Sequence, residues 1–329
     1  MHYLRRRLMA ALPAALTTSA IAPLAGAQGS GFPNKQVRII VPQTAGGASD
    51  GLSRIMAHEL GKRWNQQVVV ENRGGAGGTI GTDAVAKSAP DGHTWLMSYS
   101  GTHCINPWLY KSLPFDTLKD LAPLAPLATL PYVLVINPKV PAKNLAEFVA
   151  YAKANPAAVN LGSAGNGSAN HLIGEMFNAA AGIKMTHVPY KGAAGALTDL
   201  IGGQVQAFVA SAPSVMQHIR SGAVRPLGAA ATKRADALKD VPTFGEAGYA
   251  ALNFDVWFGL FVPAATPAAL VREIHGEISK VLALKEVGEK FTALGADVMT
   301  TPLDLFNRIV REDTEKWGKA VRDSGAKLD

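Results

Sequence analysis

This sequence is short of cysteine and of charge, and each shortage excludes a class of protein. Cys104 is the only cysteine among 329 residues, so the chain cannot form an internal disulfide. Charged residues make up 17% and hydrophobic residues 48%, which is the composition of a globular chain rather than a disordered one. The length is sufficient for two domains, each with its own core.

Motifs for metal, nucleotide and hydrolytic chemistry are also missing. Neither H-E-x-x-H, nor a Cys/His metal spacing, nor G-x-S-x-G occurs. The glycine run 74–81 lacks the lysine of a P-loop, and Ile80 stands where the dinucleotide motif needs its third glycine. We expect this run to pack a helix against a strand and, with Asn72, to edge a cleft. His103 and Cys104 are adjacent, and neighbours on a strand point to opposite sides, which makes them a poor base and nucleophile. We therefore expect neither an enzyme nor a cofactor, with a secreted α/β hydrolase as the alternative.

The N-terminus has the pattern of a secretory signal peptide. Arg5–Arg7 precede an apolar run, Leu8–Leu24, which ends in Ala25–Ala27. A membrane anchor is the alternative interpretation, but Pro13 and Pro23 interrupt the ~20 apolar residues that a spanning helix needs. We expect removal of the leader near Ala27, by the general or the twin-arginine export route.

The remaining charge points to a small anionic ligand rather than to nucleic acid. The leader takes three arginines from the 32 basic residues, which leaves 29 against 25 acids, a balance of +4. No basic tract is present, so nucleic-acid binding is not expected. A mild positive balance suits an anionic ligand, and an exported chain with a single thiol fits a bacterial periplasm.

Short β-rich runs alternate with helical runs along the rest of the chain. This alternation predicts an α/β fold with mostly parallel sheets. Asn144, with Glu147 three residues later, predicts a capped helix start. The expected strands are 37–41, 68–71, 94–99, 132–137, 159–161, 186–189, 207–210, 224–229 and 255–262. The expected helices are 51–64, 79–88, 144–154, 170–181, 194–201, 267–284 and 302–324.

Two segments, 130–138 and 227–235, are expected to cross between domains. The predicted organisation is a signal peptide at 1–27, the first part of domain 1 at 28–131, domain 2 at 132–230, and the second part of domain 1 at 231–329. Ligands of such folds bind in the cleft between the domains.

The strongest functional signal is a strand–loop–helix unit that occurs once in each half. The first loop is Gln43–Asp50 and the second loop is Gly162–Ser168. Each is rich in small residues and precedes a helix. The free N–H groups and partial positive charge of a helix N-terminus attract anions. Two such ends facing each other would hold a carboxylate from both sides.

Several side chains near these loops allow two interpretations. Asp50 is either a helix cap or a ligand group, and His171 is either a capping group or part of the cleft lining. Tyr190 and Lys191 follow a strand where a loop would reach the cleft. Trp257 and Phe258 alternate on a strand, so one is expected in the core and the other facing the ligand. The predicted ligand-binding residues are Gln43, Thr44, Ala45, Gly46, Gly47, Ser49, Asp50, Ser100, Thr102, Ser163, Ala164, Gly165, Asn166, Gly167, Ser168, His171, Tyr190, Lys191, Ser211 and Trp257, with no catalytic residue and no metal ligand.

Seven short motifs in a fixed order carry a resemblance to a known family. They are Ile39–Pro42 with Gly46, Gly47 and Asp50; Val69–Arg73 with Gly75–Gly78; Ala89–Gly92; Gly165–Ser168; His187–Gly192; Asp240–Thr243; and Trp317–Lys319. With these motifs the chain resembles the Bug (TctC-type) family, the extracytoplasmic solute receptors of tripartite tricarboxylate transporters.

The resemblance implies a two-domain periplasmic binding protein, type II-like, with two crossover strands, which closes like a flytrap on a small carboxylate. It implies that the first and second loops hold the carboxylate, partly through waters. The implied partners are the large and small membrane subunits of a permease, and a sensor role with a two-component kinase is an alternative.

Two departures from the family pattern suggest the kind of ligand. The first loop begins Gln43-Thr44-Ala45, where many relatives resemble Phe-Pro-Pro, so it is more polar and less rigid. Ala210 and Ser211 stand where many relatives have an acid, and without that acid a ligand ammonium lacks a partner. We therefore expect an aliphatic or aromatic carboxylate or dicarboxylate without a free amine.

Overall fold

The computed structural model describes residues 31–156, 158–190 and 192–326. The chain divides into a unit at residues 1–32 and a compact unit from Pro33 to Asp329, and only the second is described below. The predicted signal peptide and Lys191 lie outside the described residues. Within the described ranges, no helix is both long and apolar enough to cross a membrane.

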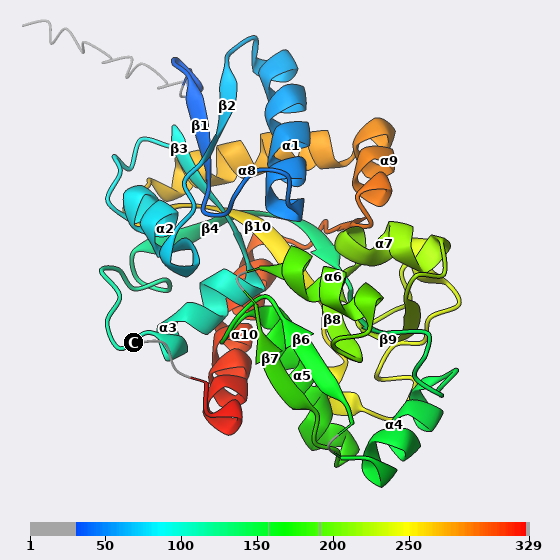
Figure 1. Ribbon diagram of the computed structural model, residues 1–329. Helices are drawn as coiled ribbons and strands as arrows, with labels where there is room; N and C mark the ends of the chain where they lie inside the picture. The colour runs from blue at the N-terminus through cyan, green and yellow to red at the C-terminus, as the bar shows by residue number, and fades with distance from the viewer. Residues whose placement is uncertain (1–30, 157, 191, 327–329) are drawn as a thin grey trace, which may run out of the picture. The chain divides into compact units, whose positions relative to one another are not determined.

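Six strands of the described chain form the first sheet, in the order β11-β4-β10-β3-β1-β2 (Figure 1). β1 is parallel to both β2 and β3, whereas β10 lies antiparallel between β3 and β4. All eight residues of β10 are buried, as is typical of a strand covered on both faces. The strands are β1 (Val37–Val41), β2 (Val68–Asn72), β3 (Thr94–Tyr99), β4 (Leu121–Leu130), β10 (Val256–Pro263) and β11 (Asp297–Val298).

The second sheet has five strands in the order β7-β6-β8-β5-β9. It repeats the arrangement β2-β1-β3-β10-β4 of the first sheet, with β5 as its antiparallel insertion between β8 and β9. The chain therefore passes between the sheets twice, as expected. The strands are β5 (Tyr132–Ile136), β6 (Asn160–Ser163), β7 (Thr186–Pro189), β8 (Ala207–Ser211) and β9 (Arg225–Ala230).

The helices lie between the strands in sequence, except for α10, which follows the last strand, and they cover the sheets (Figure 1). They are α1 (Ala48–Trp64), α2 (Thr79–Ala86), α3 (Asn106–Leu109), α4 (Leu145–Ala154), α5 (Ala169–Ala181), α6 (Ala193–Gly202), α7 (Ala212–Arg220), α8 (Ala268–Leu282), α9 (Lys285–Ala293) and α10 (Leu303–Ser324), with short turns η1 (Ala76–Gly78), η2 (Gly101–Ile105), η3 (Asp236–Leu238) and η4 (Ala250–Leu252). The last helix, α10, packs against η2, α3 and β4 on the side of the first sheet and against α5 beside the second.

The predicted helix cap at Asn144 is confirmed. The Asn144 side chain accepts a hydrogen bond from the Glu147 N–H at 2.9 Å. The Glu147 carboxylate in turn accepts the Lys143 N–H at 2.8 Å. The two side chains therefore satisfy N–H groups that have no partner inside the helix.

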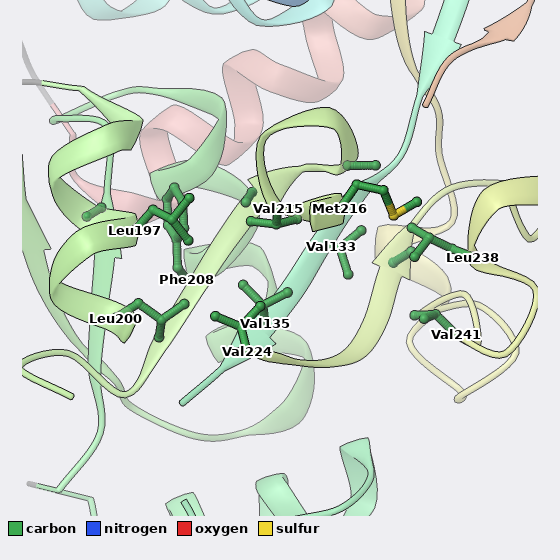
Figure 2. Packing of buried hydrophobic residues seen from close by; sticks show 14 of the residues in the cluster. Val133, Val135, Leu197, Leu200, Phe208, Val215, Met216, Val224, Leu238 and Val241 are labelled. Carbon is green, nitrogen blue, oxygen red and sulfur yellow. The ribbon is translucent and has the colours of Figure 1, made fainter. Parts of the chain in front are cut away.

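The crossing predicted at 227–235 is wrong. Its residues up to Ala230 belong to β9, inside the second sheet, and the chain returns to the first sheet only with β10. The segment before β10 packs beside the second sheet: Leu238 and Val241 join Val133 and Val135 of β5 in one buried cluster (Figure 2). Phe244 donates its backbone N–H to the carbonyl of Ala229.

The stretch around His103 and Cys104 is not a strand. It forms the turn η2, where both side chains are buried. The His103 ring stacks on Phe261 at a centroid distance of 4.1 Å, and the Cys104 thiol points to the carbonyl of Val310. The two residues therefore contribute to packing between η2, β10 and α10.

Candidate functional site

The candidate site lies where three strands of the first sheet end. β1 is followed by Pro42–Thr44, β2 by Gly74–Gly78, and β3 by Ser100–Thr102. The three strands are neighbours and parallel, so the loops that follow them emerge at one edge of the sheet. Residues from all three loops line one cavity of about 410 Å³.

The opposite wall of this cavity comes from the second sheet. It is built by Ala164 and Asn166–Asn170, the residues that connect β6 to the first turn of α5. Ser168 is the N-cap of α5, and Gly78 is the N-cap of α2 on the other wall. The N-termini of two helices, each with the partial positive charge of a helix start, therefore border the same cavity.

The lining of the cavity is polar but has no charged side chain among the described residues. The polar side chains of the lining include Tyr99, Tyr110 and Asn106. Burial raises the pKa of Tyr99 and of Tyr110, so both phenols keep their protons at neutral pH and can donate hydrogen bonds. An anion in this cavity would be held by N–H, hydroxyl and amide groups rather than by an ion pair.

The first loop is held in shape by Asp50. This residue is not the N-cap of α1, which is Gly47, but the third residue of the helix. Its carboxylate accepts the Gly46 N–H and the Arg54 guanidinium, both at 3.0 Å. Burial raises the pKa of Asp50, and the hydrogen bonds from Arg54, Gly46 and Asn72 outweigh it, so the pKa lies below its ordinary value. Asp50 is therefore an ionised support beneath the loop.

The second loop has its own internal support. The Ser163 hydroxyl accepts the Gly165 N–H at 3.1 Å, and the Ser168 hydroxyl donates to the Gly165 carbonyl at 2.7 Å. Nδ1 of His171 accepts the Gly167 N–H at 3.1 Å. These bonds join both ends of the loop to the start of α5.

Seven of the predicted site residues line the cavity, and the others that the structure describes do not. The lining residues are Gln43, Thr44, Thr102, Ala164, Asn166, Gly167 and Ser168. Ala45, Gly46 and Gly47 are exposed on the first loop, Ser49 and Asp50 are buried in α1, and Ser100 is buried in the turn after β3. Ser163 and Gly165 belong to the second loop but form its internal hydrogen bond, and His171 of α5 supports the loop from behind.

Three predicted site residues belong to other parts of the structure. Trp257 is 1% exposed, and its indole N–H donates to Asp313 at 2.8 Å, so its assignment to the ligand site was wrong. Its neighbour Phe258 is also buried, and its ring stacks on Tyr99 with a centroid distance of 5.3 Å. Neither side chain of this pair is therefore available to contact a ligand. Tyr190 donates its hydroxyl to Asp199 at 2.6 Å, and Ser211 pairs with Ser214 at the start of α7.

Sequence reasoning missed part of the lining, although a signal was present. Most of the missed residues lie at the end of β3 or in the segment that follows it, and β3 is a neighbour of β1 in the sheet. The rule that loops at the carboxyl edge of a parallel sheet meet would have grouped them with the first loop. The missed residues are Pro42, Tyr99, Gly101, Asn106, Leu109, Tyr110, Ala169 and Asn170.

The packing role predicted for the glycine run is confirmed at Gly81. A β-carbon on this residue of α2 would lie 2.8 Å from the Arg73 carbonyl and 2.9 Å from Cα of Pro42. Only glycine allows α2 to approach the ends of β1 and β2 this closely. The run also lines the cavity, as expected, through Gly74, Gly75, Gly77 and Gly78.

The burial of Cys104 and His103 argues against nucleophilic chemistry at this pair. Burial raises the pKa of the Cys104 thiol and lowers that of His103 to about 3, so neither is charged at neutral pH. A reactive cysteine needs thiolate character and access to substrate, and this thiol has neither.

Comparison with known proteins identifies what the chain resembles. Residues 52–326 match the model of the tripartite tricarboxylate transporter family receptor, TctC. Protein BugT of Bordetella pertussis is 36% identical over 323 residues, covering 98% of each chain.

Two similar solved structures contain a ligand. Rpa4515 of R. palustris with adipate is 30% identical with a TM-score of 0.81, over 90% of this chain and 100% of that one. MatC of Rhodopseudomonas palustris with bound malate is 32% identical with a TM-score of 0.77, over 88% of this chain and 100% of that one. The two-sheet architecture is that of the periplasmic binding proteins, as the sequence predicted.

Proposed function

Because the chain belongs to the TctC family of tripartite tricarboxylate transporter receptors, which are solute-binding proteins and not enzymes, we propose that it captures a small dicarboxylate without a free amine. The proposed site is the cavity between the first and second loops. Both loops lead into helices, and a side chain from the first turn of each helix accepts an N–H group of the loop, Asp50 from Gly46 and His171 from Gly167.

The observation that carries this proposal is the uncharged polar lining of the cavity. Backbone N–H groups at helix N-termini, tyrosine and threonine hydroxyls and side-chain amides can donate to carboxylate oxygens. The volume of about 410 Å³ is that of a small-molecule site. Relatives that share about a third of the sequence hold adipate and malate, both of them dicarboxylates.

The same lining disfavours an amino acid as the ligand. A buried ammonium needs a carboxylate or several oxygen acceptors to offset the loss of hydration. No aspartate or glutamate lines the cavity in the described chain. Asp50, the acid of the first loop, is already paired with Arg54 and Gly46.

The proposed setting is the periplasm, after removal of the leader near Ala27, with the two membrane subunits of a tripartite transporter as partners. The leader pattern and the periplasmic relatives support this location. We also propose that each sheet forms the core of one lobe and that the lobes close on the ligand. The packing of Leu238 and Val241 against β5 favours a second lobe that extends beyond the expected boundary at residue 230.

A thermal-shift panel on protein freed of bound solute tests the proposal. Adipate, malate, aspartate and glutamate are compared at equal concentration, with calorimetry for every compound that raises the melting temperature. We expect stabilisation by at least one dicarboxylate without an amine. Stronger stabilisation by aspartate or glutamate than by adipate and malate would contradict the ligand class.

A further inference from the structure

His171 is buried directly behind the second loop. It is 5% exposed, and its Nδ1 lies 3.1 Å from the Gly167 nitrogen. A backbone N–H can only donate, so Nδ1 must carry no proton, and the neutral imidazole must be protonated on Nε2. This hydrogen bond selects one tautomer of the ring.

A second histidine fixes the plane of this ring. His187 of β7 stacks on His171 with a centroid distance of 3.8 Å and an angle of 15° between the ring planes. Nε2 of His187 lies 2.6 Å from the hydroxyl of Ser163, at the other end of the second loop. The stacked pair therefore touches both ends of the loop that forms one wall of the cavity.

We propose that His171 is a positioning residue for ligand binding: its Nδ1 holds the Gly167 N–H, and with it the second loop, in the shape that the cavity wall requires. His187 keeps the His171 ring in the orientation that this bond needs. This inference rests on the proposed function only for its effect on affinity, since the effect on the loop is independent of the ligand.

The surroundings keep both rings neutral at ordinary pH. Burial and the neighbouring His187 lower the pKa of His171 to about 4, and burial lowers that of His187. Glu175 of α5 lies 3.9 Å from Nε2 of His171, and burial raises its pKa. Lys184 and Asp323 line the cavity of about 510 Å³ that also contains His187 and Glu175. Protonation of Nδ1 would set a donor against the Gly167 N–H, so the loop should loosen as the pH falls toward 4.

Imidazole nitrogen NMR on the wild-type protein gives the first test. With ¹⁵N-labelled histidine at pH 7, we expect His171 to show an unprotonated Nδ1 and a protonated Nε2. A ring protonated on Nδ1 at this pH cannot accept the Gly167 N–H and would overturn the proposal. The measurement needs neither a ligand nor a variant.

Two substitutions separate the hydrogen bond from simple space filling. His171→Phe keeps a ring that can stack on His187 but has no acceptor, whereas His171→Asn places an amide oxygen near the position of Nδ1. We expect amide exchange at Gly167 to accelerate about tenfold or more in the Phe variant and to stay within about threefold of wild type in the Asn variant. Equal exchange in all three proteins would contradict the positioning role.

Binding of adipate and malate by calorimetry completes the test. We expect affinity to fall about fivefold or more in His171→Phe and to recover in His171→Asn. Wild-type affinity should decline as the pH falls toward 4. The Asn variant should lack the part of this decline that comes from protonation of His171. Unchanged affinity in the Phe variant would overturn the role in binding. If neither compound binds the wild type, the proposed function fails for them, while the tautomer and exchange measurements still decide whether His171 positions the loop.

Discussion

Gly167 of the second loop lies directly against the side chain of Leu109 in α3. A β-carbon at position 167 would overlap both terminal carbons of Leu109. Gly167 also has φ +71°, in the left-handed region that favours glycine. Two independent constraints therefore require glycine where the walls of the cavity from the two sheets meet.

Gly167→Ala should weaken ligand binding about tenfold or more, because the added methyl group separates the two walls of the cavity. Gly182→Ala is the matched control, since Gly182 at the other end of α5 has φ +60° and no atom within 4 Å of an added β-carbon. The control should lose about 1 kcal/mol of stability and keep its affinity. Calorimetry with the best dicarboxylate of the panel measures the affinity of both variants. Wild-type affinity in Gly167→Ala would refute the prediction.

Gly81→Ala should destabilise the protein by about 1–3 kcal/mol, since the methyl group meets backbone atoms of Arg73 and Pro42 that cannot move independently of the strands. Gly276 in α8 has open space around it, so Gly276→Ala should instead stabilise by about 0.5–1 kcal/mol through helix propensity. Urea denaturation of the two variants gives the comparison. Equal effects would show that α2 can shift to accept the methyl group.

Glu59 should make the stability of the folded protein depend on pH in the acidic range. This buried side chain of α1 accepts a hydrogen bond from Lys290 of α9 at 2.7 Å, and that bond lowers its pKa from the ordinary 4.5. Its contribution is complete above pH 4.5 and is lost as the pH falls through the lowered folded-state pKa. Glu59→Gln should cost about 1–2 kcal/mol at pH 7 and progressively less below that window.

The control for Glu59 is an exposed ion pair. Glu289 is 66% exposed in its pair with Lys285, so Glu289→Gln should change stability by less than about 0.5 kcal/mol at any pH. Denaturation midpoints from pH 3 to pH 8 distinguish the two variants. A constant difference between wild type and Glu59→Gln across this range would count against the ionised pair.

Trp257→Phe should reduce stability and leave binding intact. The substitution removes the donor to Asp313, a buried acceptor, at a cost of about 1–3 kcal/mol. Because Trp257 packs in the core beneath α10 and does not line the cavity, the dissociation constant should stay within about twofold. A large loss of affinity with little loss of stability would restore Trp257 to the ligand site.

The sequence predicted most of the elements but not the strands β4 and β11 or the helices α3, α7 and α9. Most of the expected strands differ from the observed ones by one or two residues, since alternation and short loops define them well. β4 contains Pro123 and Pro126, which usually argue against an interior strand. Its pairing with β10 shifts register near both prolines, and these irregularities accommodate residues that cannot donate to the ladder.

The candidate site could be predicted at the level of loops and less well at the level of side chains. The sequence identified both loops, because a run of small residues directly before a helix is a pattern of consecutive residues. Whether a hydroxyl faces the cavity or the loop behind it depends on neighbours distant in sequence. Ser163, for example, lies 2.6 Å from His187 and is fully buried, which no local pattern indicates.

The position of β10 means that the first sheet can finish folding only after the second sheet has been synthesised. β3 and β4 follow one another along the chain, yet they pair through β10, which is made only after the whole second sheet. Until that strand arrives, the first sheet is split and two strand edges stay open to other chains. A chain shortened before Val256 would therefore lose the centre of its first sheet rather than its margin, and the cavity wall that follows β1, β2 and β3 depends on a strand that contributes no residue to it.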